Sequence, residues 1–148
     1  MKKFKFTLQA LFNYKLTVEK VQLGELRRAQ QALRELLDEK QRLQQAMIGN
    51  ERSLANALRR RLNVVQALKQ HDAYFKYLRD CLIELEPRII EAKELRDRCR
   101  DKLIVTMKEI KTLRKLHDEQ YQAYVKEVQA EESKEIGDLV SFNVIAEG

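Results

Sequence analysis

The chain has 148 residues, and 35% of them are charged, with 29 Lys and Arg against 23 Asp and Glu. No apolar run approaches the roughly 18 residues of a membrane span, and the basic start leads into no long apolar stretch. We therefore expect no direct membrane insertion and no secretory signal. Many Leu, Lys, Glu, Arg and Gln with few Gly and Pro are typical of long helices.

The first expected helix spans about residues 5–65 and the second about residues 73–136. One heptad register runs without a phase slip from Leu26 to Tyr124, as two series of seam positions three residues apart. Counting Ala, Cys and Tyr as apolar, 21 of these 29 seam positions are apolar, against 44% of the whole chain. A narrow apolar stripe of this kind predicts an all-α coiled coil.

The register does not show where the chain folds back, so weaker helix formers must locate the turn. Such residues lie at 63–65 and 70–72, and Asp72 would cap a helix that follows it. A turn within 63–73 would give two arms of similar length, whereas one at Gly49 would not. The expected fold is an antiparallel two-helix coiled-coil hairpin, and a parallel homodimer of one long helix is the competing geometry.

The distribution of charge favours the hairpin. Residues 1–74 hold 15 Lys and Arg and 7 Asp and Glu, whereas residues 75–148 hold 14 and 16. Two antiparallel arms would attract each other, whereas a parallel homodimer would bring Arg59–Arg61 against its own copy. We expect a monomer. The basic residues are mixed with Glu along the helices, so we expect no nucleic acid partner.

The second helix is expected to stop at Gly137, which is followed by Asp138. Residues 137–148 then form an irregular tail that keeps no helical period. The tail is expected to fray or to dock only on a partner.

No pattern of catalytic or metal-binding residues is present. His71 and His117 are solitary, and there is no phosphate-binding glycine loop. Cys81 and Cys99 would lie roughly 27 Å apart on one helix, so they cannot pair with each other. We expect no enzyme, no cofactor and no metal.

Aromatic residues concentrate at two places. One group lies near the N-terminus, at Phe4, Phe6, Phe12 and Tyr14, and the other follows the expected turn, at Tyr74, Phe75 and Tyr77. Only part of each group can face the seam. The remaining rings either stiffen the ends of the hairpin or anchor a partner.

Three segments together resemble the family of the flagellar export protein FliJ. The opening segment has Phe4, Phe6, Leu8, Leu11, Tyr14, Lys15 and Glu19. Near the other end stand Lys111, Leu113, Lys115, Leu116, Glu119, Tyr121, Glu127, Glu131, Lys134, Glu135 and Asp138. Residues 74–78 resemble the aromatic segment that opens the second helix of the family. The chain departs from the family pattern at Leu139, where a second acid is more usual, and in the absence of glycine from residues 59–71.

The resemblance implies a hairpin similar to the central stalk (gamma) subunit of rotary ATPases. The implied function is a non-enzymatic stalk of the flagellar type III export apparatus. It would bind the hexameric export ATPase and promote its assembly, couple it to the export-gate membrane protein and escort export chaperones. It would lie in the cytoplasm, peripheral to the inner face of the cell membrane at the flagellar base.

On this resemblance we expect the two ends of the hairpin to bind different partners. The residues expected to contact the ATPase are Phe4, Phe6, Leu8, Leu11, Lys111, Arg114 and Lys115. Those expected to contact the gate are Tyr74, Phe75 and Leu78. The alternatives are a stalk protein of a non-flagellar type III secretion system and a structural, self-associating coiled coil with no ATPase partner.

Overall fold

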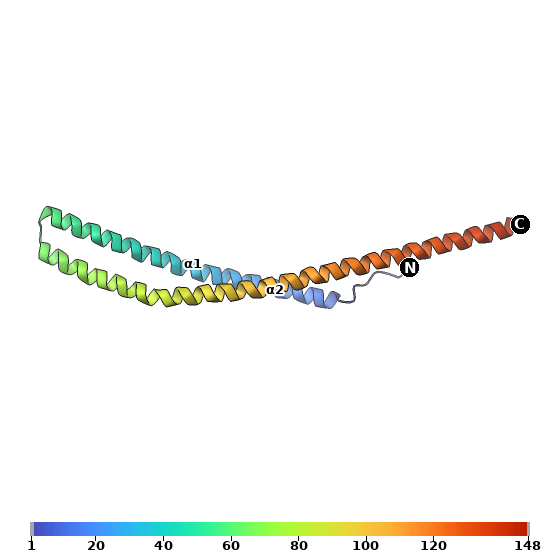
Figure 1. The fold of residues 1–148 in the computed structure, drawn as a ribbon, viewed down its shortest axis with the longest axis horizontal. Coiled ribbons are helices and arrows are strands. Elements are labelled where there is room, and N and C mark those ends of the chain that lie inside the picture. Colours follow the sequence, from blue (N-terminus) through green and yellow to red (C-terminus); the bar gives the residue numbers. More distant parts are fainter. Residues whose placement is uncertain (1, 148) are drawn as a thin grey trace. The chain divides into compact units, whose positions relative to one another are not determined.

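In the computed structural model, which describes residues 2–147, two long helices pack against each other in opposite directions (Figure 1). Helix α1 spans Gln9–Arg60, and helix α2 spans Val64–Glu147. No strand occurs among residues 2–147. The prediction of an all-α fold built from two packed helices is confirmed.

The chain divides into two units, each of which contains a part of both helices. The turn unit comprises Gln22–Lys102, and the terminal unit comprises Met1–Val21 with Leu103–Gly148. In the turn unit, Lys40 Nζ lies 3.3 Å from Glu86 Oε2 across the two helices. In the terminal unit, Lys15 forms an ion pair with Glu109.

The core of the turn unit is a layer of branched apolar side chains between the helices. Leu33, Leu85 and Ile89 form its centre, and Ile89 is only 1% exposed. Leu36, Leu43 and Ala92 pack around them. Full burial of a Leu or Ile side chain contributes about 1.5–3 kcal/mol, so this layer is a main source of helix pairing.

The core of the terminal unit lies along α2. Leu103, Ile110 and Leu113 are buried there, together with Thr106. Phe6 is the buried residue that the chain's opening segment contributes to this unit. Because Phe6 precedes α1, the core of this unit includes a side chain that no helical register could place.

The heptad register describes the packing of both units. Of the ten buried residues in the described chain, nine are seam positions and the tenth is Phe6. Of the 29 seam positions, only Arg61, Leu68 and Phe75 are exposed. The prediction that one stripe forms the contact between the helices is therefore confirmed, and its exceptions gather near the turn.

The turn occupies residues 61–63, so the expected window of 63–73 was placed too late. Arg61 and Asn63 take the left-handed backbone conformation, with φ of 53° and 45°. Asn63 also accepts a hydrogen bond at its carbonyl from the amide of Ala67, over 2.9 Å, which opens α2. Asparagine tolerates this conformation better than most residues, which suits Asn63 to the last position of the turn. Asp72 lies inside α2 and does not cap it.

The chain enters α1 at Gln9, four residues later than expected. Residues 3–8 alternate between exposed Lys3, Lys5 and Thr7 and less exposed Phe4, Phe6 and Leu8. A period of two is that of an extended segment with one side against a surface. Figure 1 shows this non-helical segment running beside α2.

The expected irregular tail is helical, because α2 continues through Gly137 to Glu147. A glycine ends a helix when it adopts a left-handed conformation, and Gly137 does not. Residues 129–147 are all exposed, so this part of α2 packs on no other described segment. Pro87 also lies inside α2, on its exposed side, without ending it. Within residues 2–147 no helix is long and apolar enough to cross a membrane.

Candidate partner-binding surfaces

An aromatic cluster joins the chain's opening segment to α2 in the terminal unit. The Phe4 ring lies edge-on to His117 and to Tyr121, with centroids 5.4 Å and 5.2 Å away. Phe6 makes a similar edge contact with His117 at 5.2 Å. Edge-to-face ring pairs are favourable beyond the area they bury, so this cluster fixes the opening segment on α2.

Hydrogen bonds also join the opening segment to α2. Tyr124 donates a hydrogen bond from its hydroxyl to the carbonyl of Lys2 over 2.5 Å. Gln120 donates from Nε2 to Thr7 Oγ1 over 3.2 Å. The two segments that carry the terminal motifs are therefore held together by both rings and hydrogen bonds.

The residues expected to contact an ATPase do not form one exposed surface. Phe6 is buried and Phe4 and Leu8 are half-buried, because they pack within the unit. Leu11 is 42% exposed. Phe4 and Phe6 thus position the opening segment, and Leu11 is the apolar residue of this set that remains open to a partner.

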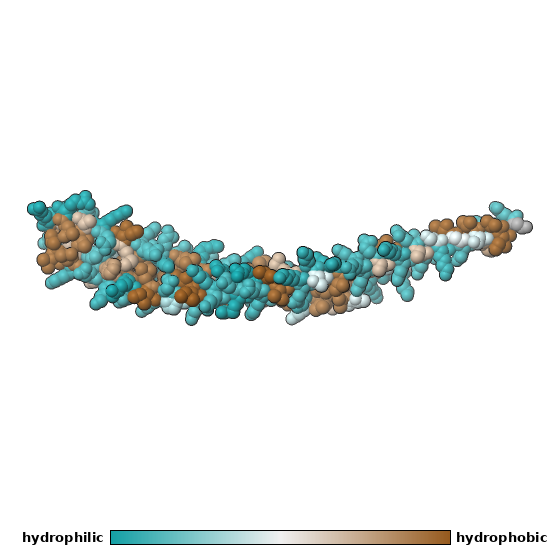
Figure 2. All heavy atoms as spheres, in the orientation of Figure 1, coloured by the Kyte–Doolittle hydropathy of each residue, from teal (hydrophilic) through white to brown (hydrophobic). Residues whose placement is uncertain are grey.

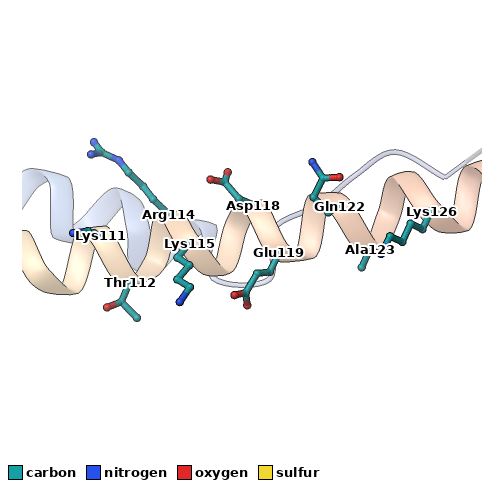
Figure 3. A pocket seen from close by; sticks show the side chains of 9 residues that line it. All are labelled: Lys111, Thr112, Arg114, Lys115, Asp118, Glu119, Gln122, Ala123 and Lys126. Carbon is teal, nitrogen blue, oxygen red and sulfur yellow. The ribbon is translucent and has the colours of Figure 1, made fainter.

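The expected basic residues of this set are exposed along α2. Figure 3 shows Arg114 and Asp118 projecting on one side of the helix and Lys115 and Glu119 on the other. All four line a shallow hollow together with Lys111, Thr112, Gln122, Ala123 and Lys126. Four bases, Lys111, Arg114, Lys115 and Lys126, stand here beside two acids, Asp118 and Glu119, so this open surface offers charge pairing to a protein. The Arg114 guanidinium also lies 6.0 Å from the centre of the Phe12 ring, close enough for a cation–π contact.

The aromatic residues near the turn are open to solvent. Tyr74 and Tyr77 are 44% and 61% exposed, and their rings stack with centroids 6.3 Å apart. Phe75 stacks on the ring of His71 at 6.0 Å. A hydrogen bond with the side chain of Cys81 raises the pKa of the Tyr77 hydroxyl above its ordinary value.

The prediction that Leu78 belongs to the gate-binding surface is wrong. Its side chain is only 2% exposed, because Leu78 is a seam position and packs between the helices. A partner that approaches the folded turn unit meets Tyr74, Phe75 and Tyr77, whereas the buried Leu78 is not accessible to it.

The sequence patterns missed a polar junction in the turn unit. His71 Nε2 lies 2.7 Å from Glu51 Oε1, and its Nδ1 lies 3.2 Å from Asp72 Oδ1. Asn50 donates from Nδ2 to the carbonyl of His71 over 3.1 Å. The hydrogen bond with Glu51, and then that with Asp72, raises the pKa of His71. The signal was present, because Asn50 and His71 are both polar interruptions of the second seam series.

Cys81 and Cys99 are free thiols in the structure. Among the described residues, no three His, Cys, Asp or Glu side chains come close enough to hold a metal ion.

No family model, curated protein or solved structure matches this chain. Its function is therefore inferred from the motif residues and from their geometry.

Proposed function

We propose that this chain is a non-enzymatic stalk component of a flagellar type III protein export apparatus. In this function it binds the hexameric export ATPase and promotes its assembly, and it also contacts the export-gate membrane protein and escorts export chaperones. In this proposal the paired helices play the part that the central stalk plays in a rotary ATPase. The chain would lie at the cytoplasmic face of the cell membrane.

The observation that carries this proposal is the junction of the terminal motifs. Phe4 and Phe6 come from the opening motif, whereas His117, Tyr121 and Tyr124 lie in the segment of the closing motif. Their rings pack together in the terminal unit. The opening and closing motifs lie at opposite ends of the sequence. Their packing against each other gives a physical reason why both belong to one family pattern.

In the proposed complex, the terminal unit presents the exposed Leu11 of α1 and the exposed cations Lys111, Arg114 and Lys115 of α2 to the ATPase ring. The side chain of Leu11 would bury itself in an apolar pocket of the ring, and the three cations would pair with acidic side chains of the ring. Phe4 and Phe6 act indirectly, because they hold the opening segment in place.

The gate-binding surface in this proposal is the exposed group of Tyr74, Phe75 and Tyr77. Large exposed aromatic side chains supply much contact area and few lost rotamers, which suits them to anchor a partner. Leu78 is left out of this contact, because its side chain is buried.

The test is a titration of a purified export ATPase with this chain, measuring ring formation and turnover. We expect the chain to promote both, and we expect Lys111→Glu, Arg114→Glu and Lys115→Glu combined to abolish the effect. A matched control reverses three exposed cations of the turn unit, Arg34, Lys93 and Arg98, and should retain it. No response to the unmodified chain, or an equal loss in both triple variants, would contradict the proposal. Repeating the titration with the ATPase of a non-flagellar secretion system separates the two kinds of export apparatus.

One observation favours the structural alternative of a self-associating coiled coil. Ile83 and Ile90 lie one heptad apart on the outer side of α2 and are 62% and 50% exposed. A second copy could cover them. The mass in solution decides, because a stalk is expected to be a monomer and a structural coiled coil a dimer. Ile83→Lys with Ile90→Lys should leave the mass unchanged if the stalk proposal holds.

A further inference from the structure

The end of the turn unit where α1 and α2 are joined combines exposed apolar side chains with unopposed positive charge. Leu62 and Val65 are 63% and 68% exposed, and Leu58 and Leu68 are 43% and 41% exposed. Figure 2 shows apolar residues gathered at this end of the molecule, with hydrophilic ones around them. We call residues 58–68 the turn tip. An exposed apolar group of this kind, rimmed by polar residues, marks an interaction surface.

No acidic residue occurs between Glu51 and Asp72, whereas this stretch contains five cations. They are Arg52, Arg59, Arg60, Arg61 and Lys69, and all of them are exposed. Among the described residues, none of the five forms an ion pair. The two flanking acids both lie against His71. The turn tip therefore carries positive charge that the chain itself does not neutralise.

The chemistry of the turn tip selects among possible occupants. A second copy is disfavoured, because it would bring Arg59–Arg61 against the same three residues. Residues 52–71 contain no Phe, Tyr or Trp on which a nucleic acid base could stack. Arginine binds phosphate oxygens in a bidentate manner, and aliphatic side chains at a convex end can enter an apolar layer. A membrane with anionic headgroups offers phosphates to the arginines of the turn tip and an apolar layer to its aliphatic side chains.

We propose that the turn tip docks on an anionic lipid bilayer, with Arg59, Arg60 and Arg61 on lipid phosphates and Leu62 and Val65 in the headgroup boundary. The contact is peripheral. It does not depend on the proposed function in protein export, although it would hold Tyr74 and Phe75 close to a membrane protein.

The experiment is co-sedimentation of the full chain with vesicles of phosphatidylcholine alone or of phosphatidylcholine mixed with phosphatidylglycerol. We expect binding to the mixed vesicles only, weakened by salt. Replacing Arg59, Arg60 and Arg61 by Gln should lower the partition coefficient on the order of 100-fold, at roughly fivefold per cation. A matched control, with Arg27, Arg28 and Arg34 replaced by Gln, removes the same charge elsewhere in the turn unit and should retain most of the binding.

Insertion is measured separately from charge attraction. The chain contains no Trp, so Leu62→Trp introduces a single reporter, whose emission should shift to the blue on mixed vesicles. Leu62→Ser with Val65→Ser should weaken binding severalfold and leave its salt dependence unchanged. Circular dichroism of each variant checks that the exposed substitutions preserve the helices.

Three outcomes would overturn the proposal. One is equal loss of binding in the two Arg→Gln triple variants, which would make the attraction a property of net charge. Another is a Leu62→Trp emission that does not change on vesicles. The third is binding of duplex DNA or of single-stranded RNA through the turn tip without vesicle binding, which would assign the surface to nucleic acid. Because no ATPase is present in these measurements, their result is independent of the test of the proposed function.

Discussion

Glu51 of α1 and His71 of α2 are joined across the two helices, with Glu51 Oε1 only 2.7 Å from His71 Nε2. The backbone carbonyl of His71 also accepts the hydrogen bond from Asn50. A titratable group therefore links the arms of the turn unit, a few residues from the exposed rings of Tyr74 and Phe75.

This junction makes the stability of the turn unit depend on pH. The hydrogen bond with Glu51, followed by that with Asp72, raises the pKa of His71 above its ordinary value of 6.5. Since the folded state holds the proton more tightly, the contribution is complete below pH 6.5 and is lost as pH rises through the raised pKa. Urea unfolding on both sides of this window should show the loss, and His71→Gln should abolish that part of the pH dependence. An unchanged pH dependence in His71→Gln would show that the junction does not contribute.

Leu78 and Tyr77 are adjacent in sequence and should respond differently to truncation. Leu78→Ala leaves a cavity between the helices and should lower the free energy of unfolding by about 2–5 kcal/mol. Tyr77→Ala removes an exposed ring and should cost less than about 1 kcal/mol. Chemical denaturation measures both. Similar losses in the two variants would contradict the burial of Leu78 described here.

Gly49 offers a way to stabilise α1 without touching its packing. A Cβ added at Gly49 meets nothing within 4 Å, and its backbone is helical. Gly49→Ala should therefore raise the free energy of unfolding by roughly 0.5–1 kcal/mol. The reverse change at an exposed position of the same helix, Ala55→Gly, should lower it by a similar amount. Thermal unfolding followed by circular dichroism measures both, and a loss of stability in Gly49→Ala would contradict an open site.

Phe6 should control the attachment of the opening segment to α2. Phe6→Ala removes the edge contact with His117 and the buried ring, so amides of residues 2–8 should exchange faster with solvent. Amides of the turn unit should keep their protection, because Phe6 makes no contact there. Phe6→Leu retains an apolar side chain and should show an intermediate effect. Global loss of protection in Phe6→Ala would mean that the two units unfold together.

The heptad register predicted where the helices touch, because burial in a two-helix protein follows one stripe. Leu78 shows how far that rule extends. It was part of the seam series, so its burial could be predicted, and its assignment to a partner surface conflicted with the register. The exposure of Leu68 and Phe75 could not be read from the register, because it arises from their position close to the turn.

The ends of the helices were harder to predict. A three-residue turn that preserves the phase leaves no mark in the periodicity, and the left-handed conformation of Arg61 follows from the path of the chain and not from its residue type. Gly137 and Asp138 looked like a stop, but a helical glycine costs only about 1 kcal/mol and α2 continues. At the candidate surfaces, the alternation of Lys3, Phe4, Lys5 and Phe6 was a readable signal of an extended segment. The polar seam positions Asn50 and His71 were also a readable signal of a junction, but the partner Glu51 was not, because it lies outside the seam and its position depends on the register between the arms.

The common register of α1 and α2 restricts how the arms of the turn unit can change in length. An inserted residue would rotate every seam position beyond it by about 100° out of the contact. Seven residues added to one arm would restore the stripe but would slide that arm by one repeat, so that Lys40 no longer met Glu86 and Asn50 no longer met His71. Both arms must therefore gain or lose seven residues together. In sequences that share this arrangement, the total length of the two arms should therefore differ in steps of fourteen residues.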